Sequence, residues 1–340
     1  GACAASGAHY CDLTGEPGWM RSLIDDHHAA AVASGAKIVP CCGFDSVPAD
    51  VGSLMAAAEY ARRRGRPAAR VRTYLTKVLG GFSGGTLSTG WRLAEDPVER
   101  ASYSDPNALV PGAPAIRVKT AASPQSPIGF ENLEPVYDGD LQAWATLSPF
   151  APCDVKVVRR SVALLNARGD ADAAGVPPYA PLDAFAYDGM LAAFELGTPV
   201  GWASAAATAG LVRAAVSGAL NPETREMMKP WLPAPGEGPP DWVQALGFWE
   251  MRFAAEGEGG GDAVWCAMRG NGDPGYADTA RILAESGMLL AREGGALGEG
   301  GGVLTPATAL GGALLLRRLE PHGISFEVDG DKPRGVWFSF

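Results

Sequence analysis

Hydrophobic and polar positions along the first 80 residues alternate in the order expected of parallel strands joined by crossover helices. Residues 2–5 are typical of the last turn of a helix, and residues 8–13 predict a short strand directly after it. Apolar side chains then recur along one helical face, which predicts a helix that begins at Thr14 or Gly15 and ends at Gly35.

The next segments continue the alternation of strand and helix. The almost unbroken apolar run at residues 36–41 predicts a strand buried on both faces. A helix that ends at Gly65 follows, and we expect Asp45 or Ser46 to cap its first N–H groups. Residues 69–79 alternate well enough to predict a longer strand with one polar face.

Beyond residue 80 the pattern is more varied and shows no internal repeat. A glycine-rich turn at residues 80–90 opens a helix, and Asp154 is expected to cap a helix that ends at Gly169. The other predictions are irregular loops at 105–135 and 229–241, a hairpin at 247–270, helices at 274–292 and 306–319, and a strand at 323–328.

The segment from Gly189 to Leu220 has only two charged residues, Glu195 and Arg213. Small side chains dominate it and Pro199 interrupts it, which argues against a helix that crosses a membrane. Two interpretations stay open: an ordinary buried helix, which we favour, and a face that rests on a membrane or lipid surface.

Length, charge and cysteine content narrow the class of protein. The 340 residues are enough for two domains, and 28 Lys and Arg against 38 Asp and Glu give a net charge of −10. This charge argues against a nucleic-acid partner. The six cysteines form no C-x-x-C pair and the four histidines have no metal-ligand spacing, so we expect buried thiols in a reducing compartment and no metal.

The string GNGDPG matches the dinucleotide-binding pattern G-x-G-x-x-G at Gly270, Gly272 and Gly275. The strand before it belongs to an antiparallel hairpin, and no strand ending in an acidic residue follows about 20 residues later. Asp273 as N-cap and Pro274 at the first helical position explain the string by helix capping, which is the interpretation we favour.

The string CCGFDSVPADVG at residues 41–52 is a sharper signal. The chain leaves a buried parallel strand, turns at Gly43 and enters a helix at the carboxyl edge of the sheet, where open α/β folds bind ligands. Phe44 is suited to flank a planar ring, and Asp45 is the early carboxylate placed in this turn. The alternative is a well-capped helix without a ligand.

Two further groups of polar residues are candidates for chemistry. Asp12, Thr14 and Glu16 follow the neighbouring strand, where carboxylates suit acid–base work or, as we prefer, a solvated helix N-terminus. Ser83 and Thr86 offer hydroxyl groups suited to an anion or a carbonyl oxygen, and equally to a tight turn.

Six strings in a fixed order resemble the saccharopine dehydrogenase-like oxidoreductases, and among them the bacterial trans-acting enoyl reductases most closely. The resemblance covers residues 1–328. The strings are HYCDLTGE, CCGFDSVPADVG, GGFSGGT, DVKVVRRSVALL, GNGDPGYADTARILAESG and GGVLTPATALGGALLLRRLEPHGISFEV.

The resemblance implies an α/β fold, with an incomplete Rossmann domain (a doubly wound parallel sheet) and an inserted mixed α/β domain. In that family a glycine-rich phosphate loop and roughly three βα units come before a segment similar to this beginning, so we expect an N-terminally truncated, inactive chain. The implied parts are the end of the dinucleotide-binding domain (1–70), an inserted substrate or interaction domain (71–272), returning helices and strand (273–328) and a tail (329–340).

The implied activity is reduction of a carbon–carbon double bond in a lipid or polyketide-type enoyl substrate, free or carrier-bound, with NADP or NAD as cofactor. Hydride transfer places negative charge on a thioester oxygen, so a hydrogen-bond donor and a proton source are needed. The implied catalytic donors are Tyr10, Ser83 and Thr86, and the implied cofactor-binding residues are Asp12, Thr14, Gly43, Phe44, Asp45 and Ser46.

Two alternatives stay open within the same fold. One is a catalytically silent protein of a lipid surface, because animal relatives associate with lipid droplets. The other is a saccharopine-type amino-acid dehydrogenase, which needs basic residues for substrate carboxylates, and only Arg92 lies close after the candidate loop. We expect a cytoplasmic protein, at most peripheral to a membrane or lipid droplet, and leave a homodimer open.

Overall fold

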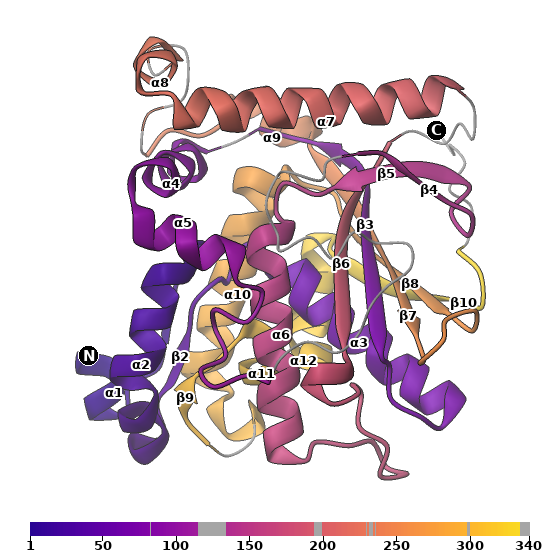
Figure 1. Cartoon of the computed structure of the whole chain (residues 1–340). Helices are drawn as coiled ribbons and strands as arrows, with labels where there is room; N and C mark the ends of the chain where they lie inside the picture. Colours follow the sequence, from indigo (N-terminus) through magenta and orange to yellow (C-terminus); the bar gives the residue numbers. More distant parts are fainter. Residues whose placement is uncertain are drawn as a thin grey trace.

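The computed structural model describes residues 1–81, 83–114, 134–193, 199–228, 230, 234, 236–297 and 300–333 (Figure 1). Its strands form two sheets. The small sheet has the order β1 (Tyr10–Cys11), β2 (Lys37–Val39), β9 (Gly302–Val303), and all its pairs are parallel. The large sheet has the order β10 (Ser325–Gly330), β8 (Val264–Gly270), β7 (Phe248–Glu256), β3 (Arg70–Leu79), β6 (Ala186–Ala193), β5 (Ala143–Leu147), β4 (Val136–Asp138).

The helices connect and cover these sheets. Their bounds are α1 (Ala2–Ser6), α2 (Pro17–Ser34), α3 (Val47–Arg64), α4 (Gly84–Glu95), α5 (Pro97–Ser104), α6 (Ala151–Arg168), α7 (Pro199–Leu220), α8 (Pro222–Met228), α9 (Asp241–Leu246), α10 (Thr279–Arg292), α11 (Pro306–Ala309) and α12 (Gly312–Leu319). A π-helical turn, η3 (Pro274–Asp278), leads directly into α10. The predicted α/β class is confirmed, whereas the insertion of one domain into another and the predicted domain boundaries stay predictions.

The small sheet is buried on both faces, as the apolar run in its second strand predicts. Ile38 belongs to a core cluster with Met20 and Ile24 of α2, whereas Val39 belongs to the main core with Ile282 of α10. The two apolar residues of β2 therefore pack on opposite faces of the small sheet, each among side chains of a helix.

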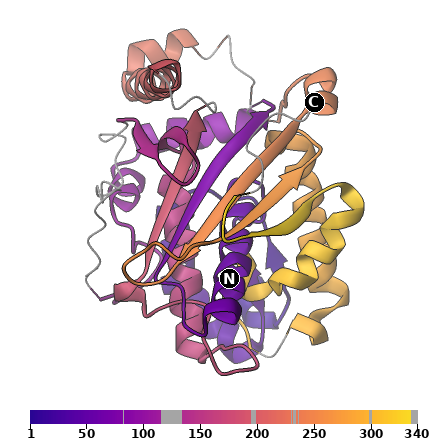
Figure 2. The same cartoon turned by 90° about the vertical axis from the view of Figure 1, so that its right-hand side faces the viewer.

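The large sheet carries the main core on the face covered by α3 and α6, whereas its other face carries charged side chains together with the buried rings of Tyr74 and Trp265. Trp249, Met251 and Phe253 of β7 lie in the main core, and Glu250 and Arg252 alternate with them. The predicted hairpin is confirmed by the antiparallel pairing of β7 with β8. Figure 2 shows the long strands of this sheet obliquely, with the helices α7 and α8 beyond one end of them.

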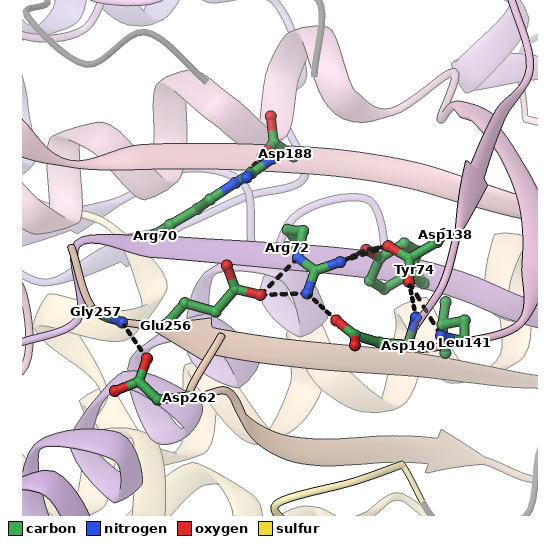
Figure 3. Close-up of polar contacts among 10 residues, drawn as sticks. All are labelled: Arg70, Arg72, Tyr74, Asp138, Asp140, Leu141, Asp188, Glu256, Gly257 and Asp262. Atoms are coloured by element: carbon green, nitrogen blue, oxygen red, sulfur yellow. Dashed lines mark hydrogen bonds and ion pairs between the residues drawn. The ribbon is translucent and has the colours of Figure 1, made fainter. Parts of the chain in front are cut away.

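The charged face of the large sheet is held by ion pairs between strands (Figure 3). Arg72 of β3 binds Glu256 of β7, Asp138 at the end of β4 and Asp140 after it, the last at 2.8 Å. Arg70 pairs with Asp188 of β6 at 2.6 Å. The polar face predicted for residues 69–79 is thus present, but these arginines serve pairing between strands.

Several predicted element ends are wrong. The first strand covers only Tyr10–Cys11, and the helix after it begins at Pro17, with Glu16 at the N-cap. The helix predicted at 306–319 is divided at Gly311, whose φ of 59° lies in the left-handed region. The pattern also missed the elements α5, β4, β5, β6, β9, α8 and α9.

Two predicted caps are wrong as well. Ser46 occupies the N-cap of α3 without a side-chain cap, and the Asp45 carboxylate accepts no helix N–H within the described residues. Helix α6 begins at Ala151, so Asp154 lies inside its first turn, where its Oδ1 is buried without a partner. Both helices instead begin with a proline in the first turn, whose missing N–H needs no acceptor.

The segment from Gly189 to Leu220 divides into the end of β6 and the surface helix α7, which lies across one end of the large sheet (Figure 1). Ala205 and Ala209 are buried, but Trp202 is 50% exposed and Leu211 72%. The favoured interpretation, an ordinary buried helix, is therefore wrong for the outer face of α7. Within the described residues, the model holds no helix with the length and apolarity needed to cross a membrane. Most of the predicted loop 105–135, part of the loop 229–241 and most of the tail 329–340 lie outside the described residues.

Candidate functional site

The carboxyl ends of β1 and β2 meet, as parallel pairing requires. The carbonyl oxygen of Asp12 accepts a 2.7 Å hydrogen bond from the backbone nitrogen of Cys42. The Asp12 carboxylate accepts from the Tyr10 hydroxyl at 2.8 Å and from the backbone nitrogen of Thr14 at 2.9 Å. The structure therefore brings Tyr10, Asp12 and Thr14 together at this edge.

The Tyr10 hydroxyl keeps its proton and is therefore a hydrogen-bond donor rather than a base. Burial, followed by the hydrogen bond to Asp12, raises the pKa of Tyr10 to about 12. Tyr10 is nevertheless 38% exposed, and the nearby Leu13 is 48% exposed. The carboxyl end of β1 is thus open to solvent on the side where Tyr10 presents its hydroxyl.

Gly43 lies where the turn after β2 passes close to two other elements. A Cβ atom at this position would lie 3.0 Å from Leu13 Cδ2 and 3.4 Å from Thr279 Cγ2. The Gly43 carbonyl accepts from the nitrogen of Val47 at 2.9 Å, and Thr279 Oγ1 accepts from the nitrogen of Phe44 at 3.0 Å. The glycine therefore lets β1, the turn and α10 approach one another.

The three residues after Gly43 differ in their surroundings. Phe44 is buried, with its ring centroid 4.9 Å from that of Trp249 and 6.2 Å from that of Phe150. Asp45 is half-buried, and burial raises its pKa to about 6. Ser46 is buried with its Oγ 3.9 Å from Cys153 Sγ. The contact of these residues with a cofactor stays a prediction.

The glycine-rich turn after β3 opens helix α4, as predicted. Ser83 Oγ caps this helix by accepting from the nitrogen of Thr86 at 3.1 Å, and the two hydroxyls are also 3.1 Å apart. Thr89 of α4 donates to Glu16 Oε1 at 2.7 Å, which links this helix to the residues after β1. The structure thus brings α4 up to the edge that carries Asp12 and Thr14.

The GNGDPG string is a packed turn. Asp273 Oδ2 accepts from the nitrogen of Tyr276 at 2.7 Å, which confirms it as the N-cap. A Cβ atom on Gly275 would lie 1.9 Å from the carbonyl oxygen of Gly81, and one on Gly272 would lie 2.4 Å from Asp278 Oδ1. Neighbouring protein atoms already fill the space that a pyrophosphate would need, so the capping interpretation is confirmed.

The sequence analysis missed Asp50 and assigned Asp154 to a helix cap, whereas both are buried carboxylates of the helices α3 and α6. Asp50 of α3 accepts from Ser161 of α6 and, at 2.8 Å, from the nitrogen of Ala307, and burial raises its pKa to about 7. Burial also raises the pKa of Asp154 well above its usual range. Both aspartates are the fourth residue of their helix and follow a proline in its first turn, and this shared position is the signal that could have identified both.

Metal ligands do not gather in the part of the chain that the structure describes, where no three His, Cys, Asp or Glu side chains are placed to hold an ion. The polar groups at the carboxyl edge are therefore a hydroxyl, a carboxylate and backbone donors. Such groups suit a neutral or anionic organic ligand.

Comparison with known proteins places the chain in a family. No family model matches it. A trans-acting enoyl reductase of Mycobacterium tuberculosis is 33% identical over 339 aligned residues, which cover 96% of this chain and 75% of the relative. Trans-acting enoyl reductases of Mycobacterium leprae and Mycobacterium bovis are 32% and 30% identical, over 93% of this chain and 73% of each relative. With a third of its residues identical over most of both chains, this chain belongs to the trans-acting enoyl reductase family.

Proposed function

We propose that the protein is an NAD(P)H-dependent reductase that saturates the carbon–carbon double bond of a lipid or polyketide-type enoyl thioester made by another enzyme. Family membership supports the reaction class. The observation that carries the proposal for the site is the meeting of Asp12 and Thr14, at the end of β1, with the turn at Gly43 and with helix α4. Open α/β sheets bind their ligands at such a carboxyl edge.

The described residues fit one half of a nicotinamide dinucleotide. The end of β1 is open, and the space around Gly15 holds no heavy atom within 4 Å of a Cβ built there. Asp12 and Thr14 there suit the carboxamide or ribose of the cofactor, and Gly43 to Ser46 complete the proposed contact. The packed glycines of GNGDPG offer no pyrophosphate site, so we assign the pyrophosphate to residues outside those described and propose that these 340 residues alone are inactive.

The bound nicotinamide supplies the hydride, and the chain supplies the polar groups. We assign Ser83 and Thr86 to the thioester oxygen, because two hydroxyls 3.1 Å apart at a helix N-terminus stabilise developing negative charge. We assign Tyr10 as the donor that protonates the α-carbon, because its raised pKa keeps the proton on the hydroxyl until a carbanion forms.

The test uses the complete product of the gene beside the 340-residue chain, with a crotonyl or longer enoyl thioester and either reduced nucleotide. We expect nucleotide oxidation and a saturated product, identified by mass spectrometry, from the complete product. Tyr10→Phe and a Ser83→Ala, Thr86→Val double variant should each lower turnover roughly 100-fold. Ser6→Ala, an exposed hydroxyl on α1, is the matched control. Full turnover by both site variants would refute the assignment of these residues.

A second proposal is that the protein rests peripherally on a lipid surface. Exposed apolar side chains gather on α7, α8, α9 and the start of β7, namely Trp202, Leu211, Met227, Trp242, Leu246 and Phe248. Co-flotation with phosphatidylcholine vesicles should fall in a Trp202→Ser, Trp242→Ser variant and stay unchanged in Trp19→Ser, which is 39% exposed on α2. Light scattering without lipid separates this behaviour from homodimer formation through the same surface.

The saccharopine-type alternative finds less support. Its substrates carry carboxylates, and the basic residue nearest in sequence to the candidate loop, Arg92, is exposed in the last turn of α4. Ser83 and Thr86 lie at the other end of that helix. We therefore favour the enoyl substrate.

A further inference from the structure

The first turn of α2 receives its cap from a distant part of the chain. Within the described residues, Glu16 occupies the N-cap position but its side chain accepts no N–H group of the helix. The N–H groups of Gly18 and Trp19 donate instead to Glu99, at 2.8 Å to Oε2 and at 3.0 Å to Oε1. A residue of α5 thus provides the two acceptors that an N-cap side chain ordinarily supplies.

The contact between Gly18 and Glu99 is fitted closely to a carboxylate. Glu99 is only 4% exposed, and Gly18 is buried as well. A Cβ atom on Gly18 would lie 2.8 Å from Glu99 Cδ, so an alanine at this position would push the carboxylate away. The N-terminus of a helix also stabilises negative charge. The glycine and the glutamate therefore form one specific contact between α2 and α5.

The Glu16 carboxylate makes a second bridge to the same part of the molecule. Its Oε2 accepts from the nitrogen of Gly15 at 3.1 Å, and its Oε1 accepts from the Thr89 hydroxyl of α4 at 2.7 Å. A single residue, Asp96, separates α4 from α5, and Figure 1 shows both helices beside α2. The two glutamates thus fasten the helix pair α4 and α5 to the start of α2.

This helix pair and the start of α2 carry two different parts of the proposed active site. Ser83 and Thr86, at the N-terminus of α4, are assigned to the thioester oxygen. Asp12 and Thr14, directly before α2, are assigned to the nucleotide. We propose that Glu99 is a positioning residue, which holds the helix pair on α2 and so fixes these hydroxyls relative to the bound nucleotide.

The expected consequence for the reaction rests on the proposed function, whereas the contact itself does not. Hydride transfer requires the nucleotide and the oxygen-binding hydroxyls to meet the same substrate, and a displacement of about 1 Å can lower turnover roughly 100-fold. The nitrogen of Thr14 donates to Asp12 and that of Gly15 to Glu16, and neither hydrogen bond involves Glu99. Loss of Glu99 should therefore lower kcat and leave nucleotide affinity intact.

A double-mutant cycle on the melting temperature of the complete gene product tests the contact. Glu99→Ala leaves two helix N–H groups without their acceptor, so we expect Tm to fall by roughly 5 °C. Gly18→Ala displaces the same carboxylate and should lower Tm by a similar amount. In the Glu99→Ala background it should change Tm by less than about 1 °C, because the space is then empty. Equal effects of Gly18→Ala in both backgrounds would overturn the proposal.

Steady-state kinetics well below the Tm of every variant test the positioning role. With a crotonyl or longer enoyl thioester, we expect Glu99→Ala to lower kcat roughly 10-fold. The nucleotide dissociation constant, measured by fluorescence titration, should change less than about two-fold. Glu95→Ala, which removes an exposed carboxylate at the end of α4, is the matched control and should keep the wild-type kcat. An unchanged kcat in Glu99→Ala would show that the contact only stabilises the fold, and would overturn the proposal.

Glu99→Gln keeps the experiment decisive if Glu99→Ala does not fold. It preserves the shape of the side chain and one of the two acceptor oxygens, so its kcat should lie between those of the wild-type protein and Glu99→Ala. A wild-type kcat in Glu99→Gln together with unfolded Glu99→Ala would overturn the positioning role. Absence of nucleotide oxidation by the wild-type protein would refute the proposed reductase function and the positioning role with it, whereas the Tm cycle would still decide whether Gly18 and Glu99 form the contact.

Discussion

Asp273 Oδ1 accepts a 2.8 Å hydrogen bond from the backbone nitrogen of Gly81. The other oxygen of this buried carboxylate accepts from the nitrogen of Tyr276 at 2.7 Å and so caps the helix that follows. One side chain therefore ties the glycine-rich turn before α4 to the start of α10. The Gly81 N–H that it binds lies two residues before Ser83, the N-cap of α4.

Replacing the Asp273 carboxylate should lower the free energy of unfolding by more than the loss of an ordinary helix cap does. We expect Asp273→Ala to lower the free energy of unfolding by about 2 kcal/mol, because it removes the cap and leaves the Gly81 N–H without its acceptor. Urea unfolding followed by tryptophan fluorescence measures the change. Asp273→Asn, which keeps an acceptor oxygen, should lose less. Equal stability of Asp273→Ala and the wild-type protein would contradict this account.

The close approach at Gly275 predicts a large effect of a single methyl group. Gly275→Ala would place Cβ 1.9 Å from the Gly81 carbonyl oxygen, so we expect a loss of about 3 kcal/mol or more in the free energy of unfolding. Gly210 of α7 is the matched control, because no heavy atom lies within 4 Å of a Cβ built there. Gly210→Ala should raise stability by about 0.5 to 1 kcal/mol, since alanine is the better helix former. Similar changes in the free energy of unfolding for Gly275→Ala and Gly210→Ala would contradict the prediction that Gly275 is tightly packed.

The raised pKa of Asp50 predicts that the free energy of unfolding depends on pH. Burial raises its pKa from 3.8 to about 7, so the folded state holds a proton that the unfolded chain releases between these values. The stabilisation of the folded state by the protonated Asp50 carboxyl is fully present below pH 3.8 and is lost as the pH rises through 7. The free energy of unfolding should fall by up to about 1.4 kcal/mol per pH unit in this window.

Asp50→Asn isolates this contribution, because an amide does not titrate and its oxygen still accepts a hydrogen bond. We expect the difference in unfolding free energy between the variant and the wild-type protein to move in favour of the variant from pH 4 to 7. Urea titrations at a series of pH values measure it. A difference that stays constant with pH would show that Asp50 is ionised throughout.

The ion pairs of Arg72 predict that removing its buried positive charge lowers the free energy of unfolding strongly. Arg72→Leu would leave Glu256 and Asp138 without their partner on a poorly solvated face of the sheet, so we expect a loss of about 3 to 5 kcal/mol. Asp25→Ala removes the exposed pair between Arg21 and Asp25 and should cost less than about 1 kcal/mol. The loss for Arg72→Leu should also respond little to added salt. Equal losses in the two variants would contradict the assigned role.

Local chemistry made many elements predictable from the residues alone. Helices α2 and α3 end where predicted, because Gly35 and Gly65 adopt φ of 77° and 66°, which glycine adopts without steric cost. The hairpin of β7 and β8 was predictable because alternate residues of a strand point to opposite faces, whichever strand lies beside it. The turn at GNGDPG was predictable because an aspartate before Pro274 satisfies the first helix N–H groups locally.

Contacts between segments far apart in the chain were decided by the tertiary structure. Alternation in residues 69–79 predicts a strand, but only the assembled sheet places β3 between β6 and β7 and supplies the carboxylates that pair with Arg72. Asp273 and Asp154 look alike as capping residues, yet Asp154 is enclosed inside the first turn of α6 and caps nothing. A residue's own neighbours set its backbone conformation, whereas its partners, its burial and therefore its pKa come from segments that reach it only when the chain is folded.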